Sequence, residues 1–427
     1  MMSVVLLSIT TPHPTTLAAT RDGSPCSNAG GHVRTNGVTY RCVKIGKKLR
    51  WRRVVPVQRT PIAVWPTSPI SDSSQFLNLD ACRIRDEDPA LTNMTAGFPI
   101  PFGRIDLTRG ANVQIIGVDF ADKPGGTDTP QQVHQQNTQA IENFWSAQST
   151  VPTNFTWSWN PEWVRLPGSI NSYGLGGSFF EGKFNPPAYF GLAENIIRQT
   201  DDSINYGGTN LLIIVFPPRV TNSEIGTFLV HTQGSYRTNE GSIFNLIIAG
   251  GDYATPETYI HEFGHALGLT DIRDTTQLNN QKSDGMFYDI MNNPNVPELL
   301  VWHRFLLGFL ESSQIHCITS TEPSTHVLSP VAASTKKLKG LVIPLTSSEA
   351  IIVELRRALG FDSVLASRDF LVGAVVYTLD TRIPYRKSPV KVEQVLKLNQ
   401  SVSVRGYKIS VVESGPLGDV VKVEKSE

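Results

Sequence analysis

Residues 261–271 read HEFGHALGLTD, and this stretch indicates more about the fold and chemistry of the chain than any other. On an α-helix, His261 and His265 lie four residues apart, so both imidazole rings project from the same face. Gly268 allows the chain to leave the helix through a left-handed turn, which would bring Asp271 back toward the two rings. Two imidazoles and one carboxylate can bind one zinc ion and leave a fourth tetrahedral position for water or substrate. We therefore predict a catalytic zinc site with His261, His265 and Asp271 as its ligands.

The residues around this motif argue against a chance match. Apolar side chains surround the motif, so the predicted helix is buried, and two histidines and a glutamate there are costly without a metal or other partners. Glu262, beside the first ligand, is placed to act as general base for the water that the zinc would activate. Met291 follows Asp271 by twenty residues, at the place of a methionine turn that forms an apolar floor beneath a metal. The alternative for Met291 is an ordinary core methionine.

Three segments stand out together: 259–271 (YIHEFGHALGLTD), 289–292 (DIMN) and 301–310 (VWHRFLLGFL). They resemble the immune inhibitor A family of secreted bacterial metallopeptidases, over roughly residues 110–315. The resemblance implies a zincin-type, metzincin-like catalytic domain that hydrolyses peptide bonds in proteins. It assigns zinc ligation to His261, His265 and Asp271, and the base role to Glu262. The family usually has proline where this chain has Thr270, and a longer insert before the methionine segment; neither departure changes a proposed ligand.

Hydrolysis also needs a group that stabilises the oxyanion. Tyr288, next to the methionine segment, is the catalytic candidate, and a buried core tyrosine is the alternative. His231 and His303 are the other candidates, although the position of His303 on a predicted helix favours a structural role. Asp289 is expected either to orient a ligand histidine or to cap a turn.

Composition limits the class of protein. The 427-residue chain has 38 basic and 38 acidic side chains, so its formal charge is zero and nothing favours nucleic acid or an anionic membrane as a partner. No apolar run approaches the roughly 20 residues of a membrane span. The 34 glycines and 28 prolines indicate many turns and modest helix content. We expect a secreted, extracellular monomer that acts on a protein or peptide substrate.

Residues 1–23 are interpreted as a signal-like leader. They contain a short apolar segment and the small-residue stretch Leu17-Ala18-Ala19, but no positive charge precedes the apolar part. A disordered leader is the alternative.

Four cysteines fit an exported chain. Cys26 and Cys42 are expected to pair and to stabilise a small module over residues 24–54. Cys82 and Cys317 bracket the predicted catalytic region, and a bridge between them would close a long loop. The alternative is that Cys82 is a free thiolate that binds the zinc and blocks a zymogen.

The remaining sequence predicts three further parts: a Pro/Ser/Thr-rich linker over 55–75, a catalytic domain over 76–318, and a β-sandwich over 319–427. Apolar patterns in the catalytic domain predict strands at 112–120, 155–159, 210–216 and 243–249, and helices at 131–147, 189–202, 298–310 and around the motif. A strand within 225–249 is expected at the sheet edge, where a peptide substrate would add as a further strand. Seven short β-like runs follow Cys317: 327–328, 341–344, 350–356, 374–379, 390–398, 407–412 and 420–423. The predicted fold class is α+β, with a mixed sheet and an active-site helix in the catalytic half. The role of the β-sandwich stays open between substrate docking, cell-surface attachment and stability.

Calcium is considered as a second metal. Asp119, Asp122 and Asp128 could gather a Ca²⁺ ion, although their spacing matches no known calcium loop and solvated surface carboxylates are the default. The same applies to a second acidic group: Asp80, Asp86, Glu87 and Asp88.

The sequence thus predicts a secreted zinc-dependent endopeptidase. Two alternatives remain: a catalytically inactive zincin that serves as an extracellular binding module, and a zinc hydrolase that acts on a glycan or a small amide instead of a peptide.

Overall fold

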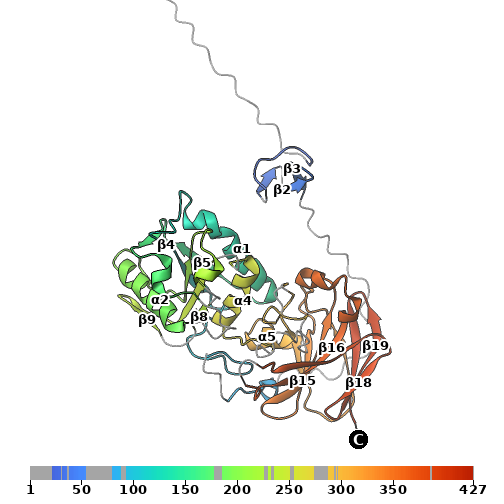
Figure 1. Ribbon diagram of the computed structural model, residues 1–427. Coiled ribbons are helices and arrows are strands. Elements are labelled where there is room, and N and C mark those ends of the chain that lie inside the picture. The colour runs from blue at the N-terminus through green and yellow to red at the C-terminus, as the bar shows by residue number, and fades with distance from the viewer. Residues whose placement is uncertain are drawn as a thin grey trace, which may run out of the picture. The chain divides into compact units, whose positions relative to one another are not determined.

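The structure is a computed structural model of the whole chain. It describes residues 22–29, 31–35, 38–53, 79–87, 93–176, 185–225, 229–231, 235–250, 254–273, 287–292, 295, 297–384 and 387–426. The chain divides into two compact units, Met1–Ala63 and Val64–Glu427 (Figure 1). The predicted linker (55–75) and nearly all of the predicted leader (1–23) lie outside the described residues.

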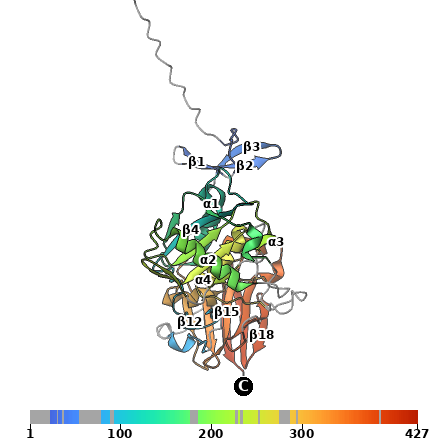
Figure 2. The same ribbon diagram turned by 60° about the vertical axis from the view of Figure 1, so that its left-hand side comes forward.

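The first unit contains a three-stranded antiparallel sheet, drawn in blue in Figure 2. Its strands are β1 (His32–Thr35), β2 (Val38–Ile45) and β3 (Lys48–Arg53). Cys42 in β2 forms a disulfide with Cys26, with the two Cα atoms 5.9 Å apart. This confirms the predicted pairing, in a module too small to build a large core of its own.

The second unit begins with a mixed sheet in the strand order β5-β4-β7-β11-β8, with β6 also paired to β4. The bounds are β4 (Ala111–Phe120), β5 (Phe155–Trp159), β6 (Val164–Leu166), β7 (Leu211–Val215), β8 (Leu229–His231) and β11 (Asn245–Ala249). All neighbours are parallel except β8, which runs antiparallel to β11 at the sheet edge. A separate hairpin is formed by β9 (Tyr236–Thr238) and β10 (Gly241–Ile243).

Helices cover both faces of this sheet. Successive side chains of a strand point to opposite faces, so Val113 and Ile115 of β4 belong to one core cluster and Ile116 and Val118 to another. The first cluster includes buried residues of α1 (Pro130–Gln148) and α4 (Pro256–Ala266), and the second includes those of α2 (Pro186–Thr200). A four-residue helix, α3 (Asn222–Ile225), follows β7.

The starts of helices α1 and α2 can be compared with those predicted from the sequence. Helix α1 begins at Pro130, one residue before the predicted helix over 131–147, because Thr129 caps the helix and proline fits its first turn. Helix α2 begins at Pro186, three residues before the predicted start at 189, because proline fits the first turn of a helix.

The C-terminal strands form two sheets, seen in orange and red in Figure 2. The first has the order β12 (Ile315–Cys317), β14 (Gly340–Pro344), β15 (Glu349–Arg356), β16 (Gly373–Asp380) and β17 (Val390–Leu396). The second has the order β13 (Ser324–Leu328), β20 (Gly418–Lys425), β19 (Tyr407–Gly415) and β18 (Ser401–Val404). Val353 and Val376 of the first sheet share a core cluster with Ile409 and Val421 of the second, so the two sheets pack face to face.

The other face of the first C-terminal sheet joins the core around α4 and the helix that follows it. Ile352 and Tyr377 belong to the same cluster as Phe263 of α4 and Trp302 of α5 (Val301–Leu306). Figure 1 labels α5 between the green and yellow elements and the orange strands. The hydrophobic core is therefore continuous across the predicted boundary between residues 318 and 319.

Helix α5 is shorter than the predicted helix over 298–310. It ends before Gly308, which has a left-handed φ of 70°, and residues 298–300 precede it without helical structure. The α+β class, with few helices and several sheets, is confirmed. No helix in the described part of the chain is long and apolar enough to span a bilayer.

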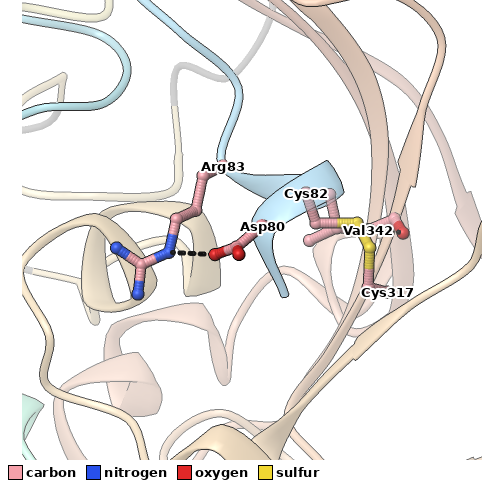
Figure 3. The surroundings of a disulfide bond; sticks show 5 residues. All are labelled: Asp80, Cys82, Arg83, Cys317 and Val342. Carbon is pink, nitrogen blue, oxygen red and sulfur yellow. Dashed lines mark hydrogen bonds and ion pairs between the residues drawn. A yellow bond between two sulfur atoms is a disulfide. The ribbon is translucent and has the colours of Figure 1, made fainter. Parts of the chain in front are cut away.

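The second predicted disulfide is also confirmed. Cys82 in η2 (Asp80–Cys82) is bonded to Cys317 in β12, with Cα atoms 5.7 Å apart (Figure 3). The alternative in which Cys82 is a free thiolate that blocks the zinc is therefore wrong. Asp80, from the acidic group considered for calcium, lies 3.8 Å from Arg83 (Figure 3).

We predict that replacing both Cys82 and Cys317 by alanine lowers the free energy of unfolding by about 2–5 kcal/mol, because the unfolded chain loses a long covalent loop. Denaturant unfolding under non-reducing conditions measures this. The matched control is the double replacement of Cys26 and Cys42, which should leave the unfolding midpoint of the second unit unchanged. If loss of the Cys26–Cys42 bridge destabilised the second unit as much as loss of the Cys82–Cys317 bridge, the assignment of the two bridges to separate units would be wrong.

Candidate metal centre

Helix α4 is fixed on its core side by apolar packing and by one indole. Thr255 caps its first turn by accepting a hydrogen bond from the Thr258 amide, and Pro256 occupies the first helical position. The Trp145 indole of α1 donates to the Ile260 carbonyl at 3.2 Å. This packing holds the face that carries His261 and His265 in a fixed orientation.

The helix ends in a Schellman motif. Gly268 has a left-handed φ of 103°, its amide donates to the His265 carbonyl at 2.9 Å, and the Leu269 amide donates to the Gly264 carbonyl at 3.1 Å. The predicted left-handed turn is therefore present. A Cβ on Gly268 would lie 3.0 Å from the Cγ of Arg104, so glycine is required here for packing as well as for conformation.

A segment from the beginning of the second unit directs the chain after this turn. The Thr95 amide donates to the Gly268 carbonyl at 2.8 Å, and the Thr270 amide donates to the Thr95 carbonyl at 3.3 Å. Asp86 in turn accepts hydrogen bonds from the Thr95 hydroxyl at 2.8 Å and from the Ala96 amide at 3.0 Å. These contacts return the chain toward α4.

The three predicted ligands come together as a result. One potential ligand atom from each of His261, His265 and Asp271 lies within 4.8 Å of the other two. Within the residues that the structure describes, this is the one group of three or more His, Cys, Asp or Glu side chains with such a geometry. The two imidazole planes are nearly perpendicular, at 86°, with centroids 4.8 Å apart.

Hydrogen bonds determine the tautomers of both rings. His261 Nδ1 lies 2.9 Å from the Ile290 carbonyl, and His265 Nδ1 lies 2.8 Å from the Leu269 carbonyl. A carbonyl oxygen only accepts, so each Nδ1 carries the proton and donates it. Each neutral ring then has its lone pair on Nε2, as a metal ligand requires, and the Nδ1 hydrogen bond fixes the ring orientation.

The third ligand supplies an atom without a hydrogen-bond partner. The Asp271 Oδ1 is buried and accepts no hydrogen bond, and it lies 3.3 Å from His261 Nε2. When His261 is neutral, two lone pairs face each other across this distance, which is repulsive unless a cation lies near both. A divalent zinc ion satisfies this requirement together with His265, so the residues present fit a zinc site.

The charges within the group favour binding of a cation. Burial opposes ionisation of Asp271, but the neighbouring His261, His265 and Arg273 side chains hold its pKa below the ordinary value. Burial would lower the pKa of His261, yet the Asp271 and Glu262 carboxylates raise it above 6.5 overall. Burial lowers the pKa of His265. Glu262 is half-buried, and its charge acts on both histidines, as expected for a carboxylate beside the ligands.

The segment that contains Met291 forms a tight turn beneath α4. The Asn292 amide donates to the Asp289 carbonyl at 3.2 Å, and the Ile272 amide donates to the Met291 carbonyl at 3.2 Å. A Cβ built on Gly264 would lie only 2.5 Å from the Met291 Sδ, so the thioether packs directly against the helix between the two ligand histidines. Met291 is fully buried and belongs to the main core, which is the core role that the sequence left as the alternative; its packing against α4 is compatible with the predicted apolar floor.

Tyr288 is not placed with the three ligands. Its hydroxyl donates to the Leu371 carbonyl at 2.7 Å, the Arg356 guanidinium lies 5.2 Å from its ring centroid, and burial raises its pKa. These contacts correspond to the buried core tyrosine that the sequence left as the alternative, and they do not support the catalytic role.

The structure also places one of the two other candidates for stabilising the oxyanion. His303 is buried, and its Nδ1 donates to Asp289 Oδ2 at 2.7 Å, which is the structural role expected for it. Asp289 also accepts from the Met291 amide, so it caps the turn and does not bind a ligand histidine directly. The side chain of His231 lies outside the described residues.

The acidic groups considered for calcium have other partners. Asp119 is buried, forms a bidentate pair with Arg165 at 2.6 and 2.7 Å and accepts from the Gly125 amide, so it is neither a calcium ligand nor a solvated surface carboxylate. Asp122 accepts from the Ile170 amide at 2.9 Å. Asp128 joins no metal-binding group within the described chain. In the second group, Asp86 accepts a hydrogen bond from the Thr95 hydroxyl, and Asp88 lies outside the described residues.

The sequence did not predict the groups that bind the side chains of His261, His265 and Asp271. The acceptors for the two histidines are the carbonyls of Ile290 and Leu269, and every residue has a carbonyl, so no residue type signals them. Arg273, 3.6 Å from Asp271 Oδ1, was missed as well, although a cation two residues after a predicted ligand was a readable signal.

Comparisons with known proteins identify no relative. No protein-family model matches this chain, and no curated protein is similar to it. The assignment of function therefore rests on the residues and their geometry.

We predict that Gly264→Ala lowers the free energy of unfolding by about 1–3 kcal/mol, because the new methyl group meets Met291 and Trp145 in a closed core. Gly191→Ala in α2 is the matched control, since a Cβ there has nothing within 4 Å and alanine favours a helix by about 0.5–1 kcal/mol. Denaturant unfolding of both variants measures the difference. Equal stability of the two variants would refute close packing of Met291 beneath α4.

We predict that zinc affinity falls as the pH is lowered, because bound protons compete with the metal for imidazole nitrogen. The raised pKa of His261 means that this fall begins at a higher pH than it would for an ordinary histidine, while Asp271, with its lowered pKa, stays ionised. Below the His261 pKa the affinity should drop about tenfold per pH unit. Competition titrations with a chelator from about pH 5.5 to 8 measure it. A flat profile would exclude a histidine-ligated site.

Proposed function

We propose that this protein is a secreted zinc-dependent endopeptidase similar to the immune inhibitor A family. The observation that carries the proposal is the ligand set itself: two Nε2 lone pairs, fixed by hydrogen bonds at Nδ1, beside an Asp271 Oδ1 that accepts no hydrogen bond. Three protein ligands leave a coordination position for substrate or water, as in catalytic and not in structural zinc sites. Two disulfide bonds are compatible with an extracellular location.

The proposed chemistry assigns a proton transfer to Glu262. Zinc supplies Lewis-acid polarisation of the attacking water and of the scissile carbonyl. Glu262 follows the first ligand on the same helix, and its half-buried carboxylate accepts the proton of the attacking water and passes it to the leaving amine nitrogen. Asp271 and the two histidines hold the metal and take no proton during the reaction.

The edge of the mixed sheet is the proposed site for the peptide backbone. Among the residues that the structure describes, strand β8 pairs with β11 on one side only, so its other side is the proposed place for an extended substrate to bind through main-chain hydrogen bonds. This favours a peptide over a glycan or a small amide, which cannot form such a ladder. The strand expected within residues 225–249 corresponds to β8.

We predict that Glu262→Gln retains the metal and loses about 10²–10⁴-fold in turnover of casein or gelatin, because the amide keeps the shape but cannot accept the proton. His261→Ala should lose the metal as well as the activity. Glu257→Gln is the matched control, since Glu257 is an exposed glutamate in the first turn of the same helix and should behave as wild type.

Metal analysis and hydrolysis assays on these variants decide between the functions. Zinc in the wild type with hydrolysis that a chelator abolishes supports the peptidase. Zinc without hydrolysis of peptides identifies a binding module or a hydrolase for another substrate. Hydrolysis by Glu262→Gln at the wild-type rate would exclude the proposed base.

A further inference from the structure

The residues before α5 form a buried segment whose backbone is bound by side chains of the C-terminal sheet. Residues 298–300 have neither helical nor strand structure, and all are buried. Arg356 of β15 is fully buried and donates to the carbonyls of Glu298 and Leu299, each at 3.0 Å. Unpaired backbone groups are costly in a protein interior, so these bonds hold the segment in one conformation.

Two carboxylates complete this arrangement. Glu354, also on β15, accepts from the Val301 amide at 2.6 Å, and Asp362 accepts from the Glu298 amide at 3.1 Å. Both carboxylates pair with Arg356, at 2.5 Å and 3.0 Å. We refer to Glu354, Arg356 and Asp362 as the β15 clamp. All three are fully buried, so each charge depends on its partners within the clamp.

The clamped segment in turn holds Asp289. The Asp289 amide donates to the Glu298 carbonyl at 3.2 Å, and its Oδ2 accepts from the Leu300 amide at 2.7 Å. The same carboxylate accepts from the Met291 amide at 2.8 Å and from His303 Nδ1 at 2.7 Å. Asp289 has a left-handed φ of 73°, which is unfavourable for a residue other than glycine, so these bonds are needed to keep it there.

The turn that begins at Asp289 contains the Ile290 carbonyl, which orients the ring of His261. Ile290 follows Asp289 directly, and its carbonyl accepts the Nδ1 proton of His261. The direction of a peptide carbonyl depends on the backbone angles of the residues beside it. A change at Asp289 therefore rotates the acceptor of His261, and with it the ring whose Nε2 faces Asp271.

We propose that Asp289 is a positioning residue for the metal ligand His261, and that the β15 clamp extends this control to the C-terminal sheets. The inference rests on the metal centre of the proposed function but not on hydrolysis. It assigns the C-terminal β-region a role in shaping the metal site, beside the docking, attachment and stability roles that the sequence left open.

The test is the binding of Co²⁺ by the full-length protein, followed by its visible absorption spectrum, which reports coordination geometry. In Asp289→Asn, an NH₂ group replaces one of the two carboxylate oxygens. It cannot accept a hydrogen bond, so at least one of the three donors (the Met291 amide, the Leu300 amide or His303 Nδ1) loses its acceptor. The Co²⁺ affinity should fall about tenfold, the effect typical of residues that orient metal ligands, and the spectrum should change in shape. Near-UV circular dichroism monitors whether the core stays folded.

Asp119→Asn is the matched control, because it makes the same change at a buried aspartate whose hydrogen-bond partners are Gly125 and Arg165 and not the metal group or its turns. It should lose stability while keeping the affinity and spectrum of the wild type. If Asp289→Asn does not fold, Arg356→Lys decides, since lysine keeps the charge but cannot bind both carbonyls and both carboxylates at once. A smaller loss of affinity and the same spectral change are then expected.

Two results would overturn the inference, and they are distinguishable. A folded Asp289→Asn, or in its place a folded Arg356→Lys, with wild-type affinity and spectrum would remove the positioning role and leave the proposed function intact. A wild-type protein that binds no Co²⁺ would remove both.

Discussion

The hydrogen bonds from His261 and His265 to two backbone carbonyls are the constraint on which the metal group depends. Because each Nδ1 donates, each Nε2 keeps a lone pair beside the half-buried Asp271 carboxylate. Neither acceptor lies on the helix that carries the histidines. One follows the glycine turn and the other belongs to the turn beneath the helix, so both turns must be in place before the rings are oriented.

Holding these turns requires chain segments far apart in sequence. The turn after α4 is held by Thr95, and the turn beneath α4 is held by Asp289 and, behind it, by Arg356. The continuous core across α4, α5 and the first C-terminal sheet gives these contacts a rigid support. The candidate metal group of His261, His265 and Asp271 spans only eleven residues of sequence. Its geometry nevertheless depends on contacts from distant parts of the second unit.

Sequence patterns predicted the parts of this structure that depend on local chemistry. The histidine spacing, the glycine turn, both cysteine pairs and most strands follow from periodicity and residue type. Tyr288 and Asp119 show the limit of such patterns, because their roles depend on partners distant in sequence: the Leu371 carbonyl for one and Arg165 for the other. The carbonyls that orient the histidines could not be predicted at all, since their function comes from position and not from residue type.

The Cys82–Cys317 bridge spans 235 residues, and this loop contains the mixed sheet, α4 and every residue of the metal group. One break of the backbone anywhere within the loop leaves two fragments that are still joined through sulfur. The buried contacts around the break keep their partners, because neither fragment can diffuse away. A single proteolytic cut in an exposed loop of this region is therefore tolerated for as long as the surroundings of the chain remain oxidising.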